Sequence, residues 1–223
     1  MRTAMWIRAL LLLVVTSQAQ AQEFIEVPGP VDDATFYRIV ACAAQPGLAC
    51  RKPEIRWPQG QRTALRVGIA QIDTGFASYR LDLVDQALDA AILEINTLGV
   101  DLGLERVFEP PFDIPIYLTD APQGGVVRGT GVPELDGVQI AIGRVAIRSR
   151  AGTIQSAAIA ISQDIRRREV ASIVLEELVQ AMGLPTDIRS PAYRDSIFSE
   201  EGNSVVWLRG QDAEALRRHY PSQ

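Results

Sequence analysis

The sequence predicts an α+β fold in which one mixed sheet packs against helices. Strand-like apolar patterns occur at 64–70 and 113–119 and twice within 138–162. Apolar residues recur with the helical period over 78–99, between the first two strands, and over 169–183, after the last strand. Strands and helices in this order, without an internal repeat, are typical of a single sheet covered by helices.

The segment 78–99 is the most regular of these elements and predicts a long helix that packs on the sheet. Its apolar stripe consists of Leu81, Val84, Leu88, Ile92 and Ile95. Ser78 has the side chain of a good N-cap, and Gly99 is a residue at which helices commonly end. The helix is therefore expected to begin at Ser78 and to stop at Gly99.

Two connecting features and one short element complete the predicted domain. The strand at 113–119 contains Pro115, which lacks a backbone donor, so we expect an edge position or a bulge. The loop over 120–137 holds five glycines and two prolines and is either a flexible flap or an ordinary long connection. A short C-terminal helix is expected over 208–220.

The N-terminus has the pattern of a secretory signal peptide over residues 1–21. The apolar run at 9–15 is too short to span a bilayer, and 19–21 provides a small-x-small cleavage site. We expect a mature chain that begins at Gln22 and lies in a periplasm or outside the cell. No later apolar run reaches membrane-spanning length, so no stable membrane insertion is expected after cleavage.

Residues 22–62 are expected to form an N-terminal extension that packs on a main domain over 63–223. The extension contains both cysteines of the chain, Cys42 and Cys50. An even number of cysteines in an exported chain favours a disulfide. A metal pair or a redox pair is the alternative, but the chain has one histidine and lacks the C-x-x-C spacing.

The charge balance bears on the class of partner. The formal net charge is −5 at pH 7, and the one basic run, at 166–168, is short. Nucleic-acid binding requires a clustered basic surface that attracts phosphates. Nucleic acid is therefore not an expected partner.

The helix predicted at 169–183 is apolar over more than half of its circumference and should be mostly buried. Its polar residues Ser172, Glu176 and Gln180 gather with Gly183 on the remaining arc, and Glu177 lies beside them. These groups must meet water, a cleft or other polar groups, because an unpaired buried carboxylate is costly. A core helix with one solvated edge is the simplest interpretation.

The segment 175–187, LEELVQAMGLPTD, resembles the metal-binding helix of zincin and metzincin peptidases, H-E-x-x-H-x-x-G-x-x-H/D. Glu177 stands at the position of the catalytic glutamate, and Gly183 at the glycine that ends the helix. Glu176 and Gln180 replace the two histidines. The resemblance implies a zincin-like mixed sheet with a buried helix of the active-site type.

The likeness continues beyond the helix and covers about residues 63–221. Thr186 falls at the third-ligand position, followed by Asp187. The segment 195–198, DSIF, occupies the region of the metzincin methionine turn, and 208–220 resembles the terminal helix of those domains.

The chain also resembles an uncharacterised family of exported bacterial proteins, the domain of unknown function numbered 2927. The shared features are the E-E-L-x-Q-x-x-G-L helix with its following Asp, the SIF segment, the terminal D-x-x-x-L-x-x-x-Y stretch, and the two cysteines after FYRIVACAA. This resemblance implies no activity. It implies that the replaced histidines are a property of a group of proteins.

The candidate site offers oxygen donors and no histidine. Catalytic zinc usually takes three protein ligands, most often including two or more histidines. Glu176, Gln180, Thr186 and Asp187 can line a cleft or bind a hard cation weakly, and Glu177 is the candidate catalytic base or the vestige of one. We therefore expect no zinc and no other cofactor.

Two functions are compatible with these residues. The first is a non-catalytic, zincin-like exported domain that binds a peptide or protein in its cleft by pairing with an edge strand, with Pro115 near the end of that strand. The alternative is an atypical hydrolase with an oxygen-ligated metal and Glu177 as its general base.

Overall fold

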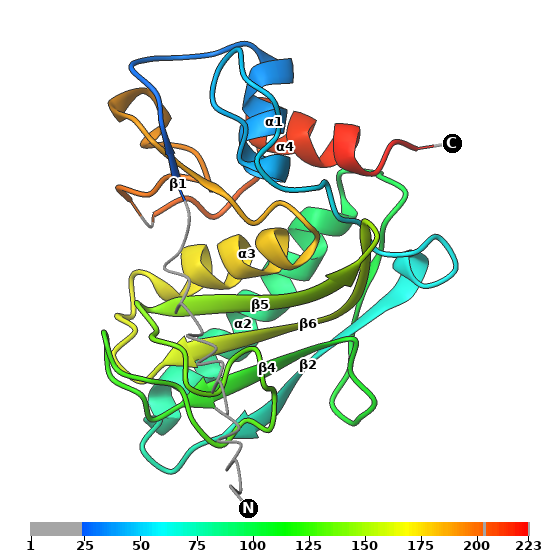
Figure 1. Ribbon diagram of the computed structural model, residues 1–223. Coiled ribbons are helices and arrows are strands. Elements are labelled where there is room, and N and C mark those ends of the chain that lie inside the picture. Colours follow the sequence, from blue (N-terminus) through cyan, green and yellow to red (C-terminus); the bar gives the residue numbers. More distant parts are fainter. Residues whose placement is uncertain (1–23, 203, 223) are drawn as a thin grey trace, which may run out of the picture.

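The computed structural model describes residues 24–202 and 204–222 (Figure 1). A five-stranded sheet with the order β3-β2-β4-β6-β5 forms the centre of the molecule. Its strands are β2 (Leu65–Ile72), β3 (Leu104–Arg106), β4 (Ile114–Thr119), β5 (Gly143–Arg150) and β6 (Thr153–Ser162). The predicted α+β class with one mixed sheet is confirmed.

Strand β5 differs from the other four in direction and position. It pairs antiparallel with β6, whereas the β2–β3, β2–β4 and β4–β6 pairs are parallel. The hairpin closes through Ala151 and Gly152, whose positive φ angles of 50° and 78° give a tight turn. β5 thus lies at one edge of the sheet, and its outer side pairs with no strand of the described chain.

The prediction that the Pro115 strand lies at an edge is wrong. Strand β4 lies in the sheet interior between β2 and β6. Pro115 pairs in register with Gly68 of β2, and the β2 register shifts between Ile69 and Gln71. The predicted alternative, a bulge, is therefore the correct one. The sheet tolerates the missing backbone donor of Pro115 next to this shift in register.

Helices α2 (Ser78–Asn96) and α3 (Val170–Ala181) lie on one face of the sheet (Figure 1). The predicted stripe of α2 packs in the main core, with Val84, Leu88, Ile92 and Ile95 buried and Leu81 half-buried. The predicted cap is wrong by one residue, because Ala77 is the N-cap and Ser78 is already helical. The helix ends at Asn96, and Gly99 follows with a φ of 67°.

The connection after β4 covers part of the opposite face of the sheet. Val127, Leu135 and Ile140 are fully buried there against Ala146 and Ala158 of the β5–β6 hairpin. Of the two alternatives for this loop, the packed connection is correct. The two faces of the sheet therefore carry a large helical core and a small loop core.

The N-terminal and C-terminal segments pack on each other in the upper part of Figure 1. Strand β1 (Phe24–Glu26) pairs in parallel with β7 (Asp187–Arg189), and helix α1 (Asp33–Cys42) packs on α4 (Gly210–His219). Short 3-10 turns are formed by Arg62–Ala64 and Pro191–Tyr193. This second layer lies beyond α3 and encloses that helix.

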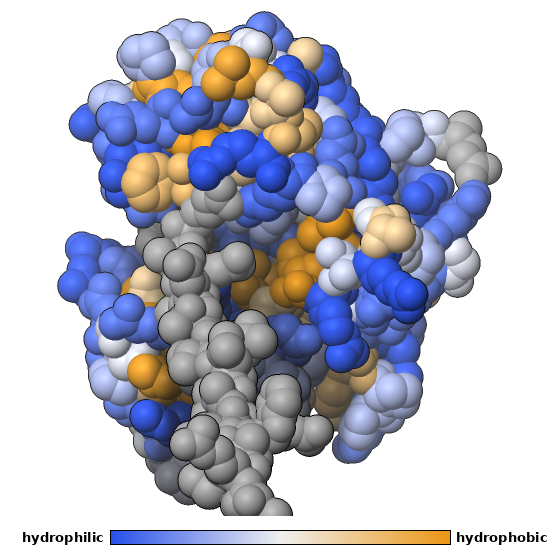
Figure 2. Space-filling view, in the orientation of Figure 1, coloured by the Kyte–Doolittle hydropathy of each residue, from blue (hydrophilic) through white to orange (hydrophobic). Residues whose placement is uncertain are grey.

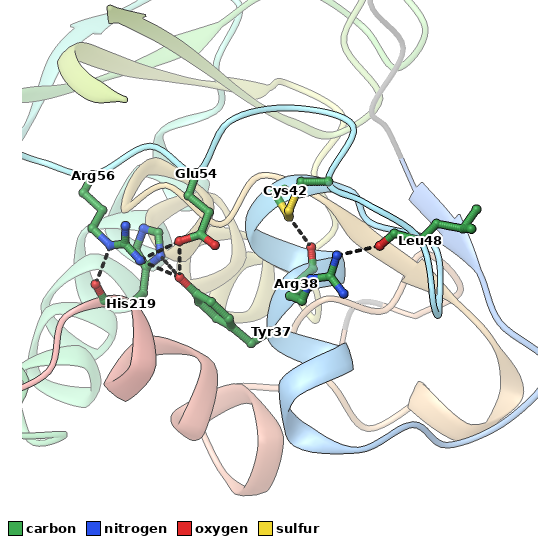
Figure 3. Close-up of a disulfide and its surroundings, with 8 residues drawn as sticks. Tyr37, Arg38, Cys42, Leu48, Glu54, Arg56 and His219 are labelled. Carbon is green, nitrogen blue, oxygen red and sulfur yellow. Dashed lines mark hydrogen bonds and ion pairs between the residues drawn. A yellow bond between two sulfur atoms is a disulfide. The ribbon is translucent and has the colours of Figure 1, made fainter. Parts of the chain in front are cut away.

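Two predictions concern export and membranes. None of the described helices is both long and apolar enough to cross a membrane. The predicted signal peptide at 1–21 lies outside the described residues. The predicted disulfide is confirmed, because Cys42 and Cys50 are bonded to each other (Figure 3). A disulfide is consistent with a compartment outside the cytoplasm.

Candidate functional site

The polar residues of α3 are all buried, so the predicted solvated edge does not exist. Ser172, Glu176, Glu177 and Gln180 are each less than 8% exposed. The sheet covers one side of the helix, and the second layer covers the other side. A single amphipathic helix in a two-layer fold keeps a solvated edge, but a helix between two layers does not.

Gln180 and Asp187 meet each other in this buried layer. The Gln180 Nε2 donates a 2.9 Å hydrogen bond to Asp187 Oδ1, and both side chains are 1% exposed. Asp187 is the first residue of β7 and is paired with Phe24 of β1. The amide therefore positions the carboxylate at the start of this small sheet.

Thr186 lies next to this pair and is only partly satisfied. Its backbone N–H donates to the carbonyl of Val40 at 3.3 Å. Its Oγ1 is buried and has no hydrogen-bond partner. A buried hydroxyl without a partner costs about 1–3 kcal/mol, so this atom is one of two unusual features of the site.

Glu177 is the second and more unusual feature. The residue is 2% exposed, and its Oε2 has no hydrogen-bond partner. The sequence predicts that this buried carboxyl group meets water, a cleft or other polar groups, and Oε2 has no such hydrogen-bond partner. The side chain points instead at Gly143, the first residue of β5, where an added Cβ would lie 2.2 Å from Glu177 Oε1.

The surroundings of Glu177 raise its pKa to about 8. Burial has the largest effect, the charge of Asp187 adds to it, and the positive charge of Arg144 acts in the opposite direction. Burial also lowers the pKa of Arg144, and Glu177 counteracts this effect. Glu177 is therefore protonated at neutral pH and can both donate and accept a hydrogen bond.

Sequence reasoning missed Gly143 and Arg144 as members of the site. They adjoin Glu177 because the antiparallel strand β5 packs against α3. Nothing in the local sequence around residue 143 indicates this contact. A correct assignment of the edge strand would have been the only signal.

The free edge of β5 presents backbone groups at every second residue. Ser162 N–H donates to Ile142 C=O at 2.8 Å, and Arg144 is opposite Ala160 in the antiparallel register. In such a ladder, residues 142, 144 and 146 bond to β6, and the alternate residues direct their N–H and C=O groups outward. The backbone groups of Gly143, Val145 and Ile147 therefore point away from β6, towards the edge that no described strand covers; Gly143 is buried there, and Val145 and Ile147 are half-buried.

The side chains of the same residues face α3. Val145 and Ile147 pack against the main core and are half-buried, whereas Ala146 belongs to the loop core on the other face. Figure 2 shows that the surface is hollowed between the sheet and the part holding α1 and α4, with hydrophobic atoms in the hollow. The edge of β5 thus combines open backbone groups with partly exposed apolar side chains.

The C-terminal end of α3 has a different character, because its polar groups are bonded. Trp57 Nε1 donates to the Ala181 carbonyl at 3.0 Å, and Tyr220 OH donates to the Met182 carbonyl at 2.6 Å. Gly183 has a φ of 102°, and a Cβ there would lie 2.1 Å from the Ile55 carbonyl oxygen. Only glycine allows the extension to approach the helix end this closely.

His219, the last residue of α4, lies at this helix end as well. It is fully buried, with Nε2 2.9 Å from the Ile55 carbonyl oxygen and Nδ1 3.2 Å from Tyr37 OH. Arg56 and Glu54 bond to the same tyrosine (Figure 3). Burial lowers the pKa of His219 to about 4, so the ring is neutral and has a structural role.

The DSIF segment forms a turn held by Asp212 of α4. Ser196 Oγ donates to Asp212 Oδ1 at 2.6 Å, and Ile197 N–H donates to Oδ2 at 2.9 Å. Burial raises the pKa of Asp212 to about 6, and these two bonds act in the opposite direction. Phe198 packs on Phe36, so this turn joins the second layer to α1.

The described side chains do not form a set of metal ligands at α3. In the described part of the chain, one group of three His, Cys, Asp or Glu residues has its ligand atoms within 4.8 Å of one another, and it is Cys42, Cys50 and Glu54. The two cysteines are bonded to each other and provide no thiolate. The expectation of no zinc stays a prediction.

The C-terminal part of the chain is similar to a known protein family. Residues 136–223 match the family model described as protein of unknown function (DUF2927). No curated protein matches the chain. The match includes β5, β6, α3, β7 and α4, but not the two cysteines. The part of the chain that holds Glu177 and the free edge of β5 is thus similar to an uncharacterised domain family.

Proposed function

We propose that this chain is an exported, non-catalytic, zincin-like domain that binds an extended segment of a peptide or protein along the free edge of β5. The segment would add a sixth strand to the sheet. Exposed sheet edges bind peptides in this way because main-chain hydrogen bonds provide affinity and alternate side chains provide specificity.

The observation that supports this proposal best is the open ladder of β5. Backbone donors and acceptors at Val145 and Ile147 point away from β6, as the register requires, and both residues are partly exposed. Proteins usually protect such an edge with charges, prolines or a covering segment. Here the central part of the strand is apolar, and its arginines stand at residues 144, 148 and 150.

The helix next to the edge supports the zincin-like part of the proposal. Glu177 occupies the catalytic-glutamate position of the resembled motif, and α3 packs on β5 and β6. The positions of the two motif histidines hold Glu176 and Gln180. Gln180 is engaged with Asp187, so its side chain stabilises the fold of the second layer. Such a site favours retained binding without hydrolysis.

A binding assay with an edge-blocked variant tests the proposal. The probe is a library of synthetic peptides long enough to form one strand, applied to the chain beginning at Gln22. Val145→Pro removes an outward N–H but no bond of the β5–β6 ladder, and prolines are tolerated at such edge positions. We expect peptides that bind the parent chain to lose at least tenfold in affinity for Val145→Pro.

The matched control is Val145→Thr, which keeps the backbone donor and a β-branched side chain. Peptides N-methylated at alternate residues provide a test that leaves the protein unchanged, since one of the two methylation frames removes the donors to the edge. The proposal fails if no peptide binds. It also fails if Val145→Pro binds peptides as tightly as Val145→Thr does and both N-methylated peptides bind as tightly as the unmethylated one.

A specific observation also favours the hydrolase alternative. A protonated carboxyl group with a pKa near neutrality and a free oxygen is typical of a general acid or base, and Glu177 has both properties. Mass spectrometry of bound peptides would detect turnover, and elemental analysis would detect one zinc per chain. If the parent chain hydrolyses peptides and Glu177→Gln abolishes this turnover, the function is that of a hydrolase and the binding proposal is wrong.

A further inference from the structure

We propose that reduction of the Cys42–Cys50 disulfide creates a zinc site whose protein ligands are the two thiolates and the carboxylate of Glu54. One ligand atom from each of these three residues lies within 4.8 Å of the other two. Two thiolates, a carboxylate oxygen and a water molecule make a tetrahedral set that suits Zn²⁺. This inference does not rest on the proposed peptide binding.

The spacing of the three ligands matches what one zinc ion requires. Zinc binds a thiolate at about 2.3 Å and a carboxylate oxygen at about 2.0–2.2 Å, so neighbouring ligand atoms on a tetrahedral ion are about 3.5–3.8 Å apart. The Cα atoms of Cys42 and Cys50 are 5.2 Å apart. Once the bond between the sulfur atoms is broken, rotation of the side chains is sufficient to reach this spacing.

Backbone hydrogen bonds hold the chain near both cysteines independently of the disulfide. The N–H groups of Arg51 and Lys52 both donate to the Cys42 carbonyl, at 3.0 and 3.2 Å. The guanidinium group of Arg38 donates to the Leu48 carbonyl within the loop. These bonds tie the loop to the last turn of α1. The two thiols of the reduced chain therefore remain neighbours.

Glu54 is oriented and ionised by two hydrogen bonds on the same oxygen. Its Oε2 accepts from Tyr37 OH at 2.8 Å and from Arg56 Nη2 at 2.7 Å (Figure 3). Partial burial raises the pKa of Glu54, but these two bonds outweigh it and hold the pKa below its ordinary value. Such outer bonds orient carboxylate ligands of metals. Because both bonds use Oε2, the other oxygen is left for the metal.

The site can be reached from solvent on one side. Cys42 is fully buried, whereas Cys50 is exposed and the Glu54 side chain is 32% exposed. A reductant and a zinc ion can therefore approach from the Cys50 side. Arg51 and Lys52 follow Cys50 in the sequence, and basic neighbours favour the thiolate form that binds metal.

The redox step balances with a dithiol as the reductant. The dithiol supplies two electrons and two protons, so that the disulfide becomes two cysteine thiols and the dithiol becomes a disulfide. Zinc binding then releases both thiol protons to water. Oxidation of the thiolates restores the protein disulfide and releases the ion. The chain would therefore bind zinc here in its reduced state alone.

Metal titration of the reduced chain tests the inference. The chain beginning at Gln22 is reduced with dithiothreitol, freed of the reductant without air, and titrated with Co²⁺ as a spectroscopic substitute for Zn²⁺. We expect one Co²⁺ per chain with thiolate-to-cobalt charge-transfer absorption, displaced by one Zn²⁺, and neither effect in the oxidised chain. Zn²⁺ should also protect both thiols from alkylation and raise the urea midpoint of the reduced chain.

Two variants and a matched control test the ligands. Cys50→Ser and Glu54→Gln should each weaken Co²⁺ binding at least about tenfold. Glu134→Gln is the control, because Glu134 is 35% exposed and pairs with Arg148 as Glu54 pairs with Arg56; it should bind like the parent. Thermal melts of the oxidised variants show whether each folds.

Three results would overturn the inference. The first is a reduced parent chain that binds neither Co²⁺ nor Zn²⁺, which requires no variant to detect. The second is Co²⁺ binding without thiolate-to-cobalt absorption or without protection of the thiols by Zn²⁺. The third is a folded Cys50→Ser or Glu54→Gln variant that binds Co²⁺ as tightly as the parent chain does.

Discussion

The two ends of the buried polar layer around α3 differ in how well their groups are satisfied. At the C-terminal end, His219 contacts the Ile55 carbonyl and Tyr37, and Asp212 accepts two hydrogen bonds from the DSIF turn. At the β5 side, Glu177 Oε2 is buried without a partner. Both ends lie in one protein core, but the carboxyl group of Glu177 keeps an oxygen without a partner.

This difference separates groups that stabilise the fold from groups that remain available to a ligand. A buried polar atom without a partner costs about 1–3 kcal/mol, whereas a completed bond contributes about 1 kcal/mol. The satisfied end therefore explains how the extension and α4 are attached. The unsatisfied Glu177, beside the buried Gly143 at the start of β5, indicates where a further hydrogen-bonding group would be stabilised.

The largest expected effect concerns the satisfied end. Gly183→Ala places a Cβ 2.1 Å from the Ile55 carbonyl oxygen at a φ of 102°. Steric collision and backbone strain add, so we expect a loss of about 3–5 kcal/mol in the free energy of unfolding, measured by urea denaturation. Gly99→Ala is the control, because its φ is 67° and nothing lies within 4 Å; it should cost about 1–2 kcal/mol. Equal losses would mean that close approach is unimportant here.

The next largest effect concerns the disulfide. Cys42 and Cys50 are separated by 8 positions, and their bond closes the loop that precedes the Glu54–Arg56 contacts with α4. Reduction should lower the free energy of unfolding by about 2–3 kcal/mol through the entropy of the unfolded chain. Denatured, unreduced protein should contain no titratable thiol. Two free thiols, or an unchanged urea midpoint after reduction, would contradict this account.

An effect of intermediate size concerns pH and Glu177. Its pKa is raised from 4.5 to about 8 by burial and by Asp187 from β7, with Arg144 from β5 acting in the opposite direction. The folded state keeps a proton that the unfolded state has released, so stability falls as pH rises from about 4.5 to 8. The maximal slope is about 1.4 kcal/mol per pH unit.

The interval between pH 6.5 and 8 isolates this group. The lowered pKa of His219 reduces stability only as pH falls from 6.5 towards 4. The pKa of Asp212 is raised to about 6, so this group changes stability mainly below pH 6.5. Urea unfolding at pH 6.5 and pH 8 should show a loss of about 1–2 kcal/mol in the parent chain. Glu177→Gln should remove most of this loss; a loss of the same size in the variant would assign it to other groups.

The smallest effect compares two buried hydroxyl groups directly. Ser196→Ala removes a donor to Asp212 and an acceptor for Phe198 N–H, and should cost about 1 kcal/mol. Thr186→Val removes a hydroxyl group that has no partner, and should change the thermal stability by less than about 0.5 kcal/mol or raise it slightly. Equal costs for the two substitutions would mean that the hydrogen bonds of the Ser196 hydroxyl group add nothing to stability.

Local patterns in the sequence were sufficient to predict the class of fold and most of its elements. The apolar stripe of α2 and the alternating pattern of β2 arise because one side of each element is buried. The spacing of apolar residues in the sequence therefore reveals both elements. The disulfide also followed, because the chain has only two cysteines. The strand of Pro115 was misplaced because one missing donor can be tolerated inside a sheet next to an irregular register.

The arrangement of the site could be predicted only in part. Glu177, Gln180 and Asp187 were identified from the motif, and the structure brings Gln180 and Asp187 into contact. Their complete burial, and the approach of Gly143, depend on a second layer and on a strand distant in sequence. The structural role of His219 could not be predicted from local patterns, because its partners Tyr37 and Ile55 are more than 160 positions away.

Amide hydrogen exchange during binding of the tightest library peptide tests the central claim most directly. The account predicts that the amides of Val145 and Ile147 exchange rapidly in the free chain and become protected in the complex. The amide of Ala146, which bonds to β6, should be protected in both states. A saturated complex in which Val145 and Ile147 exchange as fast as in the free chain would contradict binding at the edge of β5.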